Sequence, residues 1–221
     1  MLRIRTTSGK DSIPETPPGC KGAPGSYNLR MPAIFDTDRI TLRRFTEDDA
    51  PRLLALDGDP QVMRYCGPYG LPNESAYRER IRNYFQPYYA KDPRFGFWAA
   101  EERASGQFIG WFHLRPALDY RFAREAGYRD GDYDIGFRLV QAAWGKGYAT
   151  EVSRALVRRG FAEPEVHAIV AVVLIGNRAS CRVLEKLGLD RVSEFPLPGF
   201  EMPAAKYALS KADSLVTKAN L

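Results

Sequence analysis

Cysteine and histidine are scarce in this sequence of 221 residues. Its three cysteines, Cys20, Cys66 and Cys181, are odd in number and far apart, and the chain has only two histidines. A disulfide framework needs paired cysteines, and a structural zinc site needs clustered Cys and His ligands. The sequence therefore excludes both, and we expect no metal cofactor and a reducing compartment.

Long apolar runs are also missing. The longest, residues 168–175, has the length of a strand, whereas a membrane-spanning helix needs roughly 18 or more apolar residues. Residues 1–7 lack the apolar core of a secretory signal. The sequence thus predicts a protein without membrane association, and we expect it in the cytoplasm.

The excess of positive charge is small. The chain has 32 Lys and Arg against 27 Asp and Glu, a formal net charge of +5. Residues 1–30 hold five basic and two acidic residues, so only +2 remains for the rest of the chain. A nucleic-acid partner is therefore not favoured, because such proteins concentrate basic charge on their binding face.

Composition divides the chain in two. Residues 1–30 are rich in Gly, Pro, Ser and Thr and show no hydrophobic period, which predicts a flexible tail. Residues 31–221 have the length of a single domain, and Met31 is an alternative start of translation.

Hydrophobic period and capping signals predict the elements of that domain. Strand patterns and helix patterns follow each other in the order β-α-α-β-β-β-α-β-α-β-β, which indicates an α/β (α+β) fold with a mixed sheet covered by helices. The expected strands are 39–43, 95–101, 108–114, 133–139, 167–174, 190–195 and 206–209. The expected helices begin at the caps Thr46 and Asn73, cover 150–162, and run from Asn177 to a stop at Gly188, while 116–133 reads as a long functional or mobile loop.

The most specific segment is Trp144-Gly145-Lys146-Gly147-Tyr148-Ala149-Thr150, between a predicted strand and a predicted helix. Two glycines remove side chains from the turn, so that a pyrophosphate can approach the unpaired N–H groups of the helix start. A turn that uses glycine only for its backbone geometry is the plain alternative. A Walker loop is excluded because Lys146 is followed by Gly147, and a Rossmann fingerprint is disfavoured because Thr150 stands at its third glycine.

Several motifs, in order and at characteristic separations, make 36–210 resemble the GNAT superfamily of acyl-CoA-dependent N-acetyltransferases. The branch that it resembles most is that of the ribosomal-protein N-terminal alanine and serine acetyltransferases. The motifs are Thr37-Asp38-Arg39-Ile40-Thr41-Leu42-Arg43, Asp59-Pro60-Gln61-Val62-Met63-Arg64-Tyr65, Gly106-Gln107-Phe108-Ile109-Gly110, Asp134-Ile135-Gly136-Phe137, the segment 144–150 with Glu151, and Asn177-x-x-Ser180 followed by Leu184-Glu185-Lys186-Leu187-Gly188.

The resemblance implies a mostly antiparallel sheet with helices on both faces and a split between its fourth and fifth strands, those of Phe137 and Val172. It implies acetyl-CoA as cosubstrate in that split, with pantetheine beside Phe137 and Leu139 and the pyrophosphate on the amides from Gly145 to Thr150. The implied cofactor-binding residues are Phe137, Leu139, Trp144, Gly145, Lys146, Gly147, Tyr148, Ala149, Thr150, Asn177 and Ser180. Asn177 is equally well explained as a helix cap, and Lys146 as a solvated side chain.

Acetyl transfer requires a neutral amine, because an ammonium has no lone pair, and the family often places a glutamate base where this chain has Asp134. Aspartate is one methylene shorter, so it acts directly or through an ordered water, or is only a hydrogen-bonded strand carboxylate. It shares a strand face with Gly136, which leaves room beside it. Two departures stand out: Leu184 replaces the tyrosine acid of relatives, and Ala142 replaces a Gln or Arg before the glycine turn.

The remaining candidate residues give weaker evidence of a function. Cys181 is predicted to be a buried structural cysteine, and His113 and His167 lie in predicted strands without the partners of a Ser-His-Asp hydrolase. We therefore expect an N-acetyltransferase that transfers acetyl to a primary amine, either a small molecule or a protein N-terminus, by direct attack in a ternary complex. A non-catalytic acyl-CoA-binding or protein-interaction module is the alternative. The acceptor, whose site we expect near the second helix and 116–133, is left open, as is the oligomeric state, a homodimer included.

Overall fold

The computed structural model describes residues 33–67 and 70–216, which belong to the compact unit Met31–Leu221. The flexible tail predicted for 1–30 and Cys20 lie outside the described residues. None of the described helices is long and apolar enough to cross a membrane.

An eight-stranded sheet forms the centre of this unit, with the strand order β1-β2-β3-β4-β5-β6-β8-β7. Neighbours are antiparallel except β5 and β6, which are parallel. The predicted mixed, mostly antiparallel sheet is therefore confirmed. The strands are β1 (Ala33–Asp36), β2 (Ile40–Arg43), β3 (Gly96–Glu102), β4 (Phe108–Pro116), β5 (Asp132–Leu139), β6 (Ala168–Leu174), β7 (Asp190–Phe195) and β8 (Ala204–Ser210).

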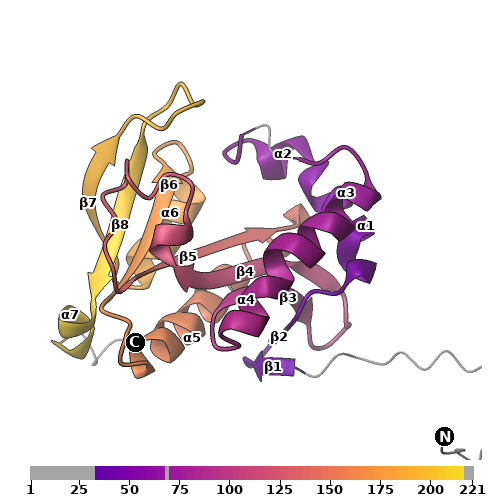
Figure 1. Cartoon of the computed structure of the whole chain (residues 1–221), viewed down its shortest axis with the longest axis horizontal. Helices are drawn as coiled ribbons and strands as arrows, with labels where there is room; N and C mark the ends of the chain where they lie inside the picture. Colours follow the sequence, from indigo (N-terminus) through magenta and orange to yellow (C-terminus); the bar gives the residue numbers. More distant parts are fainter. Residues whose placement is uncertain (1–32, 68–69, 217–221) are drawn as a thin grey trace, which may run out of the picture. The chain divides into compact units, whose positions relative to one another are not determined.

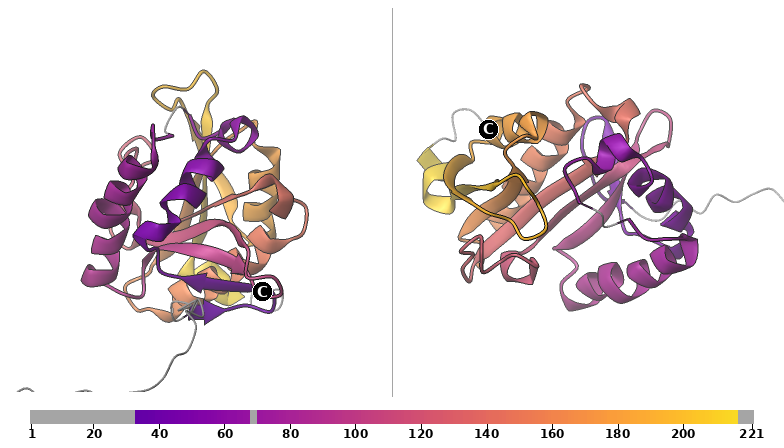
Figure 2. Two further views of the ribbon diagram at one scale, coloured as in Figure 1. Left: turned by 90° about the vertical axis from the view of Figure 1, so that its right-hand side faces the viewer. Right: turned by 90° about the horizontal axis from the view of Figure 1, so that it is seen from above.

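Helices cover both faces of the sheet, α1 to α4 one face and α5 and α6 the other (Figure 2). Alternation along β3 explains the two layers, because Phe97 packs with the first group of helices while its neighbour Trp98 packs on the side of α5. The helices are α1 (Ala50–Asp57), α2 (Pro60–Met63), α3 (Glu74–Arg80), α4 (Gln86–Lys91), α5 (Tyr148–Ala162), α6 (Arg178–Lys186) and α7 (Lys211–Val216).

The second predicted helix begins as expected and then departs from the expectation. Asn73 caps α3, with its Oδ1 accepting from the N–H of Ala76 at 3.0 Å. One π-helical turn, Ile81–Phe85, joins α3 directly to α4, and Pro87 near the start of α4 does not interrupt the helix. Pro87 directly follows Gln86, whose N–H donates to the carbonyl of Ile81 across the wider π-helical turn. The helical rod therefore continues to Lys91.

Some elements were not predicted, namely β1, α2 and α7. The helix α2 has four residues, too few for a hydrophobic period, although Asp59 caps it by accepting from the N–H of Gln61 at 2.8 Å. His167 lies just before β6 rather than inside it. The loop between β4 and β5 begins with a 3₁₀ turn, Ala117–Asp119, and buries Phe122 and Tyr128, so it is not structureless.

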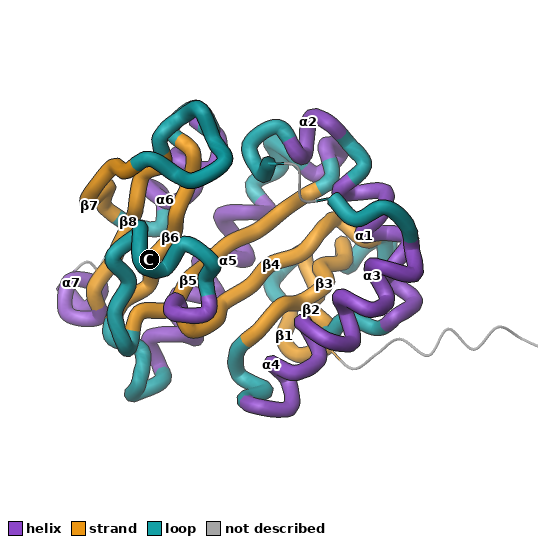
Figure 3. The backbone as a smooth tube through the Cα atoms, turned by 45° about the horizontal axis from the view of Figure 1, so that its top comes forward, coloured by secondary structure: helices purple, strands orange, loops and turns teal. Residues whose placement is uncertain are grey.

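The two parallel strands separate after three paired positions. Their pairing ends at Asp134 opposite Val170, while β5 continues along β4 to Leu139 and β6 continues along β8 to Leu174. Figure 1 and Figure 3 show the result: β6, β7, β8 and α6 lie on one side of the split and α1 to α4 on the other. This is the predicted split, now between β5 and β6 because β1 adds a strand to the count.

Candidate active site

The glycine turn before α5 forms an anion cradle. Gly145 and Gly147 have φ of 73° and 83°, a left-handed conformation that favours glycine. Gly147 is the N-cap of α5, and no side chain caps the helix. The first N–H groups of a helix have no partner within it, and the helix dipole is positive at this end. The turn therefore offers its amides to a negatively charged group.

An ion pair fastens the cradle to the start of the sheet. Arg39 donates from Nη1 to the carbonyl of Lys146 at 3.0 Å and from Nε to Glu151 in the first turn of α5 at 2.7 Å. Thr37 donates to the same carboxylate at 2.6 Å. Burial alone raises the pKa of Glu151, but these hydrogen bonds outweigh it and lower the pKa, so the carboxylate stays ionised. Arg39 and Glu151 thus fix the position of the turn.

A cavity of about 440 Å³ opens beside the cradle. Ten of the eleven residues predicted to bind the cofactor line it: Phe137, Leu139, Trp144, Gly145, Gly147, Tyr148, Ala149, Thr150, Asn177 and Ser180. Lys146 is not among the lining residues; its ammonium lies 5.9 Å from the centre of the Tyr148 ring, and its side chain is exposed.

Two of these residues already use polar groups within the protein. The Oδ1 of Asn177 accepts from the N–H of Ser180 at 3.2 Å, so it caps α6 and lines the cavity at the same time. The carbonyl of Leu139 accepts from the indole of Trp144 at 2.9 Å. This bond orients the half-exposed Trp144 ring along the cavity wall.

Basic side chains in this cavity were missed by the sequence analysis. Arg182 and Lys186, four residues apart on one face of α6, line the wall with Arg64, which follows α2. Their i, i+4 spacing in a predicted helix was the signal that could have found them. Uncapped amides together with these cations suit the diphosphate of a coenzyme.

Asp134 lies at the vertex of the split, in the last pair of β5 and β6. Its carboxylate is 2.8 Å from Nε2 of His113, 3.3 Å from the hydroxyl of Tyr128 and 3.5 Å from Nη2 of Arg115. Burial and the nearby carboxylate raise the pKa of Tyr128, so its hydroxyl remains a donor. Of these residues, the sequence analysis proposed only Asp134 for the site. Its partners come from β4 and from the loop before β5, which are separate segments of the chain.

The room expected beside Gly136 is filled. The imidazole of His113 lies over this glycine, where a Cβ would come within 2.5 Å of Cε1. Burial lowers the pKa of His113, and the bond to Asp134 does not fully offset this effect, so the ring is neutral at physiological pH. Because a carboxylate only accepts, Nε2 carries the proton. The other ring nitrogen, Nδ1, is buried without a hydrogen-bond partner among the described atoms.

A second cavity, of about 270 Å³, reaches Asp134 and His113. It meets the first cavity at six shared lining residues: Tyr65, Cys66, Phe137, Arg138, Asn177 and Ser180. The two cavities are therefore neighbours, the first at the anion cradle and the second at the buried carboxylate.

The position of the missing tyrosine is apolar. Leu184 is buried and lines the second cavity, so α6 supplies no acid at this point. Tyr65, which follows α2, lines both cavities instead. Cys66 and Cys181 are free thiols, and Cys181 is buried as predicted. Among residues 33–67 and 70–216, no group of His, Cys, Asp and Glu is arranged to hold a metal ion.

Comparisons with known proteins agree with this geometry. The profile of the family described as acetyltransferase (GNAT) domain matches residues 39–190. The FsC-acetyl coenzyme A-N(2)-transacetylase of Aspergillus fumigatus is 28% identical over 85% of this chain and 80% of its own length. The uncharacterized N-acetyltransferase YoaA of Bacillus subtilis is 32% identical over 72% of this chain and 83% of its own.

A solved structure of aminoglycoside acetyltransferase AAC(6')-Ib in complex with coenzyme A is also similar. Its TM-score is 0.63 at 25% identity, over 81% of this chain and 99% of that one.

Proposed function

The chain belongs to the acetyltransferase (GNAT) family and is an acetyl-CoA-dependent N-acetyltransferase; from this premise we propose that it acetylates a primary amine by direct attack in a ternary complex, with Asp134 as the base. One observation carries the proposal: where β5 and β6 separate, a cavity at the cradle of α5 adjoins a cavity that reaches Asp134, and six residues line both.

The cavity residues fit coenzyme A. The uncapped amides at Gly147 and Tyr148 and the cations Arg182 and Lys186 would hold its diphosphate. Backbone groups of β5 beyond Asp134 are not paired with β6, so Phe137 and Leu139 would face the pantetheine arm. When bound, acetyl-CoA supplies a thioester carbonyl that the amine nitrogen attacks, and coenzyme A leaves as a thiol.

Asp134 would remove the proton from the acceptor. Lysine-type amines have a pKa near 10.4 and N-terminal amines one of about 7.7 to 8.0, so an acceptor is largely protonated at neutral pH and needs a base. His113 and Tyr128 donate to the Asp134 carboxylate, and Arg115 faces it. These contacts hold the carboxylate in one orientation, directed at the acceptor cavity or at one water molecule in it.

Protonation of the leaving group is assigned to Tyr65. Leu184 carries no proton to give, whereas Tyr65 has a phenol group and lines both cavities. Replacement of Tyr65 by Phe should lower kcat more than it raises KM for acetyl-CoA, because the ring, and with it the wall of the cavity, is retained. An unchanged kcat in Tyr65→Phe would mean that water, and not Tyr65, protonates the leaving group.

The chemical class of the acceptor amine is the second part of the proposal. The resemblance to the ribosomal-protein N-terminal acetyltransferases supports a protein N-terminus. The relatives with a substrate in their names support a small molecule, since one is an N(2)-transacetylase and another an aminoglycoside acetyltransferase.

The test is acetyl transfer by the purified full chain. We expect release of free thiol from acetyl-CoA with at least one member of a panel of small amines and of peptides beginning with Ala or Ser. Calorimetry with coenzyme A alone checks the cofactor site independently of turnover. Tight binding without thiol release across the panel would instead support a non-catalytic acyl-CoA-binding module.

A further inference from the structure

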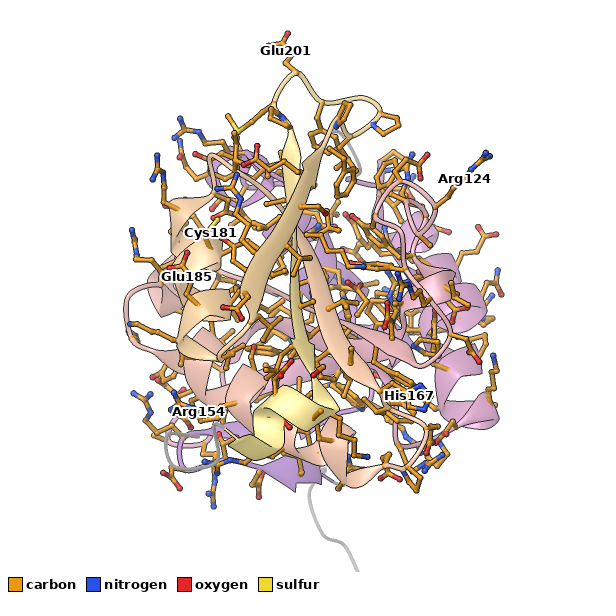
Figure 4. All side chains as sticks on the ribbon, turned by 90° about the vertical axis from the view of Figure 1, so that its left-hand side faces the viewer. Arg124, Arg154, His167, Cys181, Glu185 and Glu201 are labelled. Carbon is orange, nitrogen blue, oxygen red and sulfur yellow. The ribbon has the colours of Figure 1, made fainter. Side chains whose placement is uncertain are left out.

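The acceptor side of the second cavity has largely aromatic walls. Trp111 comes from β4, Tyr120 and Phe122 from the loop before β5, and Leu197 and Phe200 from the loop between β7 and β8. The rings of Tyr120 and Phe122 meet edge to face, with centroids 5.7 Å apart. Glu201 labels the tip of the second loop in Figure 4 and is not among the residues that line the cavity. These walls favour an apolar body beyond the reacting amine.

The charges on the walls are mainly positive. Arg121 and Arg138 line the cavity, and the one carboxylate among its described lining residues is Asp134. That carboxylate already accepts from His113 and Tyr128, so it serves one amino group at most. Asp57, near Arg138, is ion-paired with that guanidinium at 2.5 Å and accepts from Tyr77. Because Arg138 and Asp57 compensate each other, a second ammonium in this cavity would find the guanidinium of Arg121 and no further carboxylate among the described lining residues.

We propose that the acceptor is a small primary monoamine with an aromatic or branched apolar body, and that polycationic amines are selected against. This inference rests on the proposed acetyltransferase activity and adds the substrate class. The aromatic walls hold the body, Asp134 receives the reacting amine, and Arg121 on the cavity wall repels further positive charge.

The first experiment compares three amines with the full chain and acetyl-CoA: 2-phenylethylamine, spermidine and kanamycin. We expect kcat/KM for phenylethylamine to exceed the values for spermidine and kanamycin by about tenfold or more. An apolar pocket binds an apolar substrate better than a polycationic one. Faster acetylation of spermidine or kanamycin would overturn the inference while leaving the proposed function intact.

A binding experiment distinguishes failure of this inference from failure of the proposed function. If none of the three amines is acetylated, calorimetry on the protein saturated with coenzyme A decides. Tighter binding of phenylethylamine than of spermidine supports the substrate class, and the reverse order overturns it.

A matched pair of variants tests the role of charge. Arg121 lies over the Phe122 ring, 4.5 Å from its centroid, and lines the cavity; Arg124, on the same loop, points into solvent (Figure 4) and does not line it. Arg121→Glu should raise the ratio of spermidine to phenylethylamine kcat/KM, or of their affinities, by about tenfold. Arg124→Glu should leave the ratio within about twofold of the wild type. Equal ratios in the two variants would overturn the inference.

A second pair tests the apolar wall. Phe200→Ala should raise the KM or Kd for phenylethylamine by about tenfold without changing coenzyme A affinity. Val192→Ala, on the exposed face of β7, is the control, since Val192 is 54% exposed and outside the cavity. An unchanged phenylethylamine affinity in Phe200→Ala would contradict the assigned wall.

Discussion

At the scale of single residues, the central feature is a group of polar side chains on one face of two paired strands. On β4 and β5, Arg115 pairs with Asp134 and His113 with Gly136. All four therefore share one face of the sheet, and the missing side chain of Gly136 admits the imidazole against the carboxylate. Asp134 was proposed from the resemblance to the family, at a position that the strand pattern places on the same face as Gly136, but its partners required the register of β4 against β5, which no local pattern records.

An isosteric change tests the proposed role of Asp134 as the base. Asp134→Asn keeps the shape of the cavity but removes the proton acceptor, so we expect kcat to fall by about 100-fold, the usual worth of a general base. Affinity for coenzyme A should not change, because Asp134 does not line the first cavity. Asp132→Asn, on the same strand, is the control. A wild-type rate in Asp134→Asn would remove this residue from the mechanism.

Burial of neutral His113 also predicts a pH dependence of folding. The group ordinarily titrates near 6.5, and the folded protein lowers that pKa. The unfolded chain thus binds more protons below pH 6.5, so stability is complete above this pH and is lost as the pH falls toward the folded pKa. The slope can reach about 1.4 kcal/mol per pH unit.

Urea unfolding between pH 7 and pH 5 measures this effect. His113→Gln should flatten the dependence in that window, whereas His167→Gln should retain it because His113 is still present. The groups that face His113 are Asp134, Arg115 and Arg138, and all three are unchanged in both variants. Equal slopes in the two variants would contradict the assignment.

At the scale of elements, long periodic segments were predicted and short or irregular ones were not. The caps Asn73 and Asn177 and the stop at Gly188 mark α3 and α6, because side chain to backbone bonds at helix ends are local. The π-helical turn before α4 was missed because such single turns are rare and have no known sequence pattern; in the structure its last residue, Phe85, packs against Phe97 and Ala99 of β3.

The cradle before α5 gives a prediction at this scale. Gly147→Glu places a side chain and a negative charge at the helix start, so coenzyme A binding should be lost in calorimetry. Its stability cost should be only about 1 kcal/mol, for a left-handed residue with a side chain. Gly106→Glu is the matched control, since Gly106 has φ of 69° in the turn before β4 and open space around it. If Gly147→Glu still binds coenzyme A, the diphosphate must bind at another place.

At the scale of the whole folded unit, the split leaves β5 and β6 joined through only three residue pairs. Cavity walls come from α2 on one side and from α6 on the other. A ligand that contacts both sides adds a connection that the protein lacks, and binding to the folded state alone stabilises it by mass action.

Thermal unfolding checks this expectation. At a concentration of coenzyme A 100 times its Kd, the folded protein should gain about 2.7 kcal/mol, seen as a raised Tm. Gly147→Glu at the same concentration should show no such rise. A Tm that does not respond in the wild type, despite calorimetric binding, would mean that the unfolded chain binds equally well.

The sequence by itself determined the order of most strands and helices and the glycine turn before α5, because period, capping and turn chemistry are local properties of the chain, while Asp134 was proposed from the resemblance to the family. Only the tertiary structure decided what surrounds Asp134 and where the sheet opens. His113, Arg115 and Tyr128 converge on one carboxylate through strand register and a folded loop, and the split arises because β5 follows β4 while β6 follows β8. Both depend on pairing between distant segments, and distant pairing leaves no mark in a window of neighbouring residues.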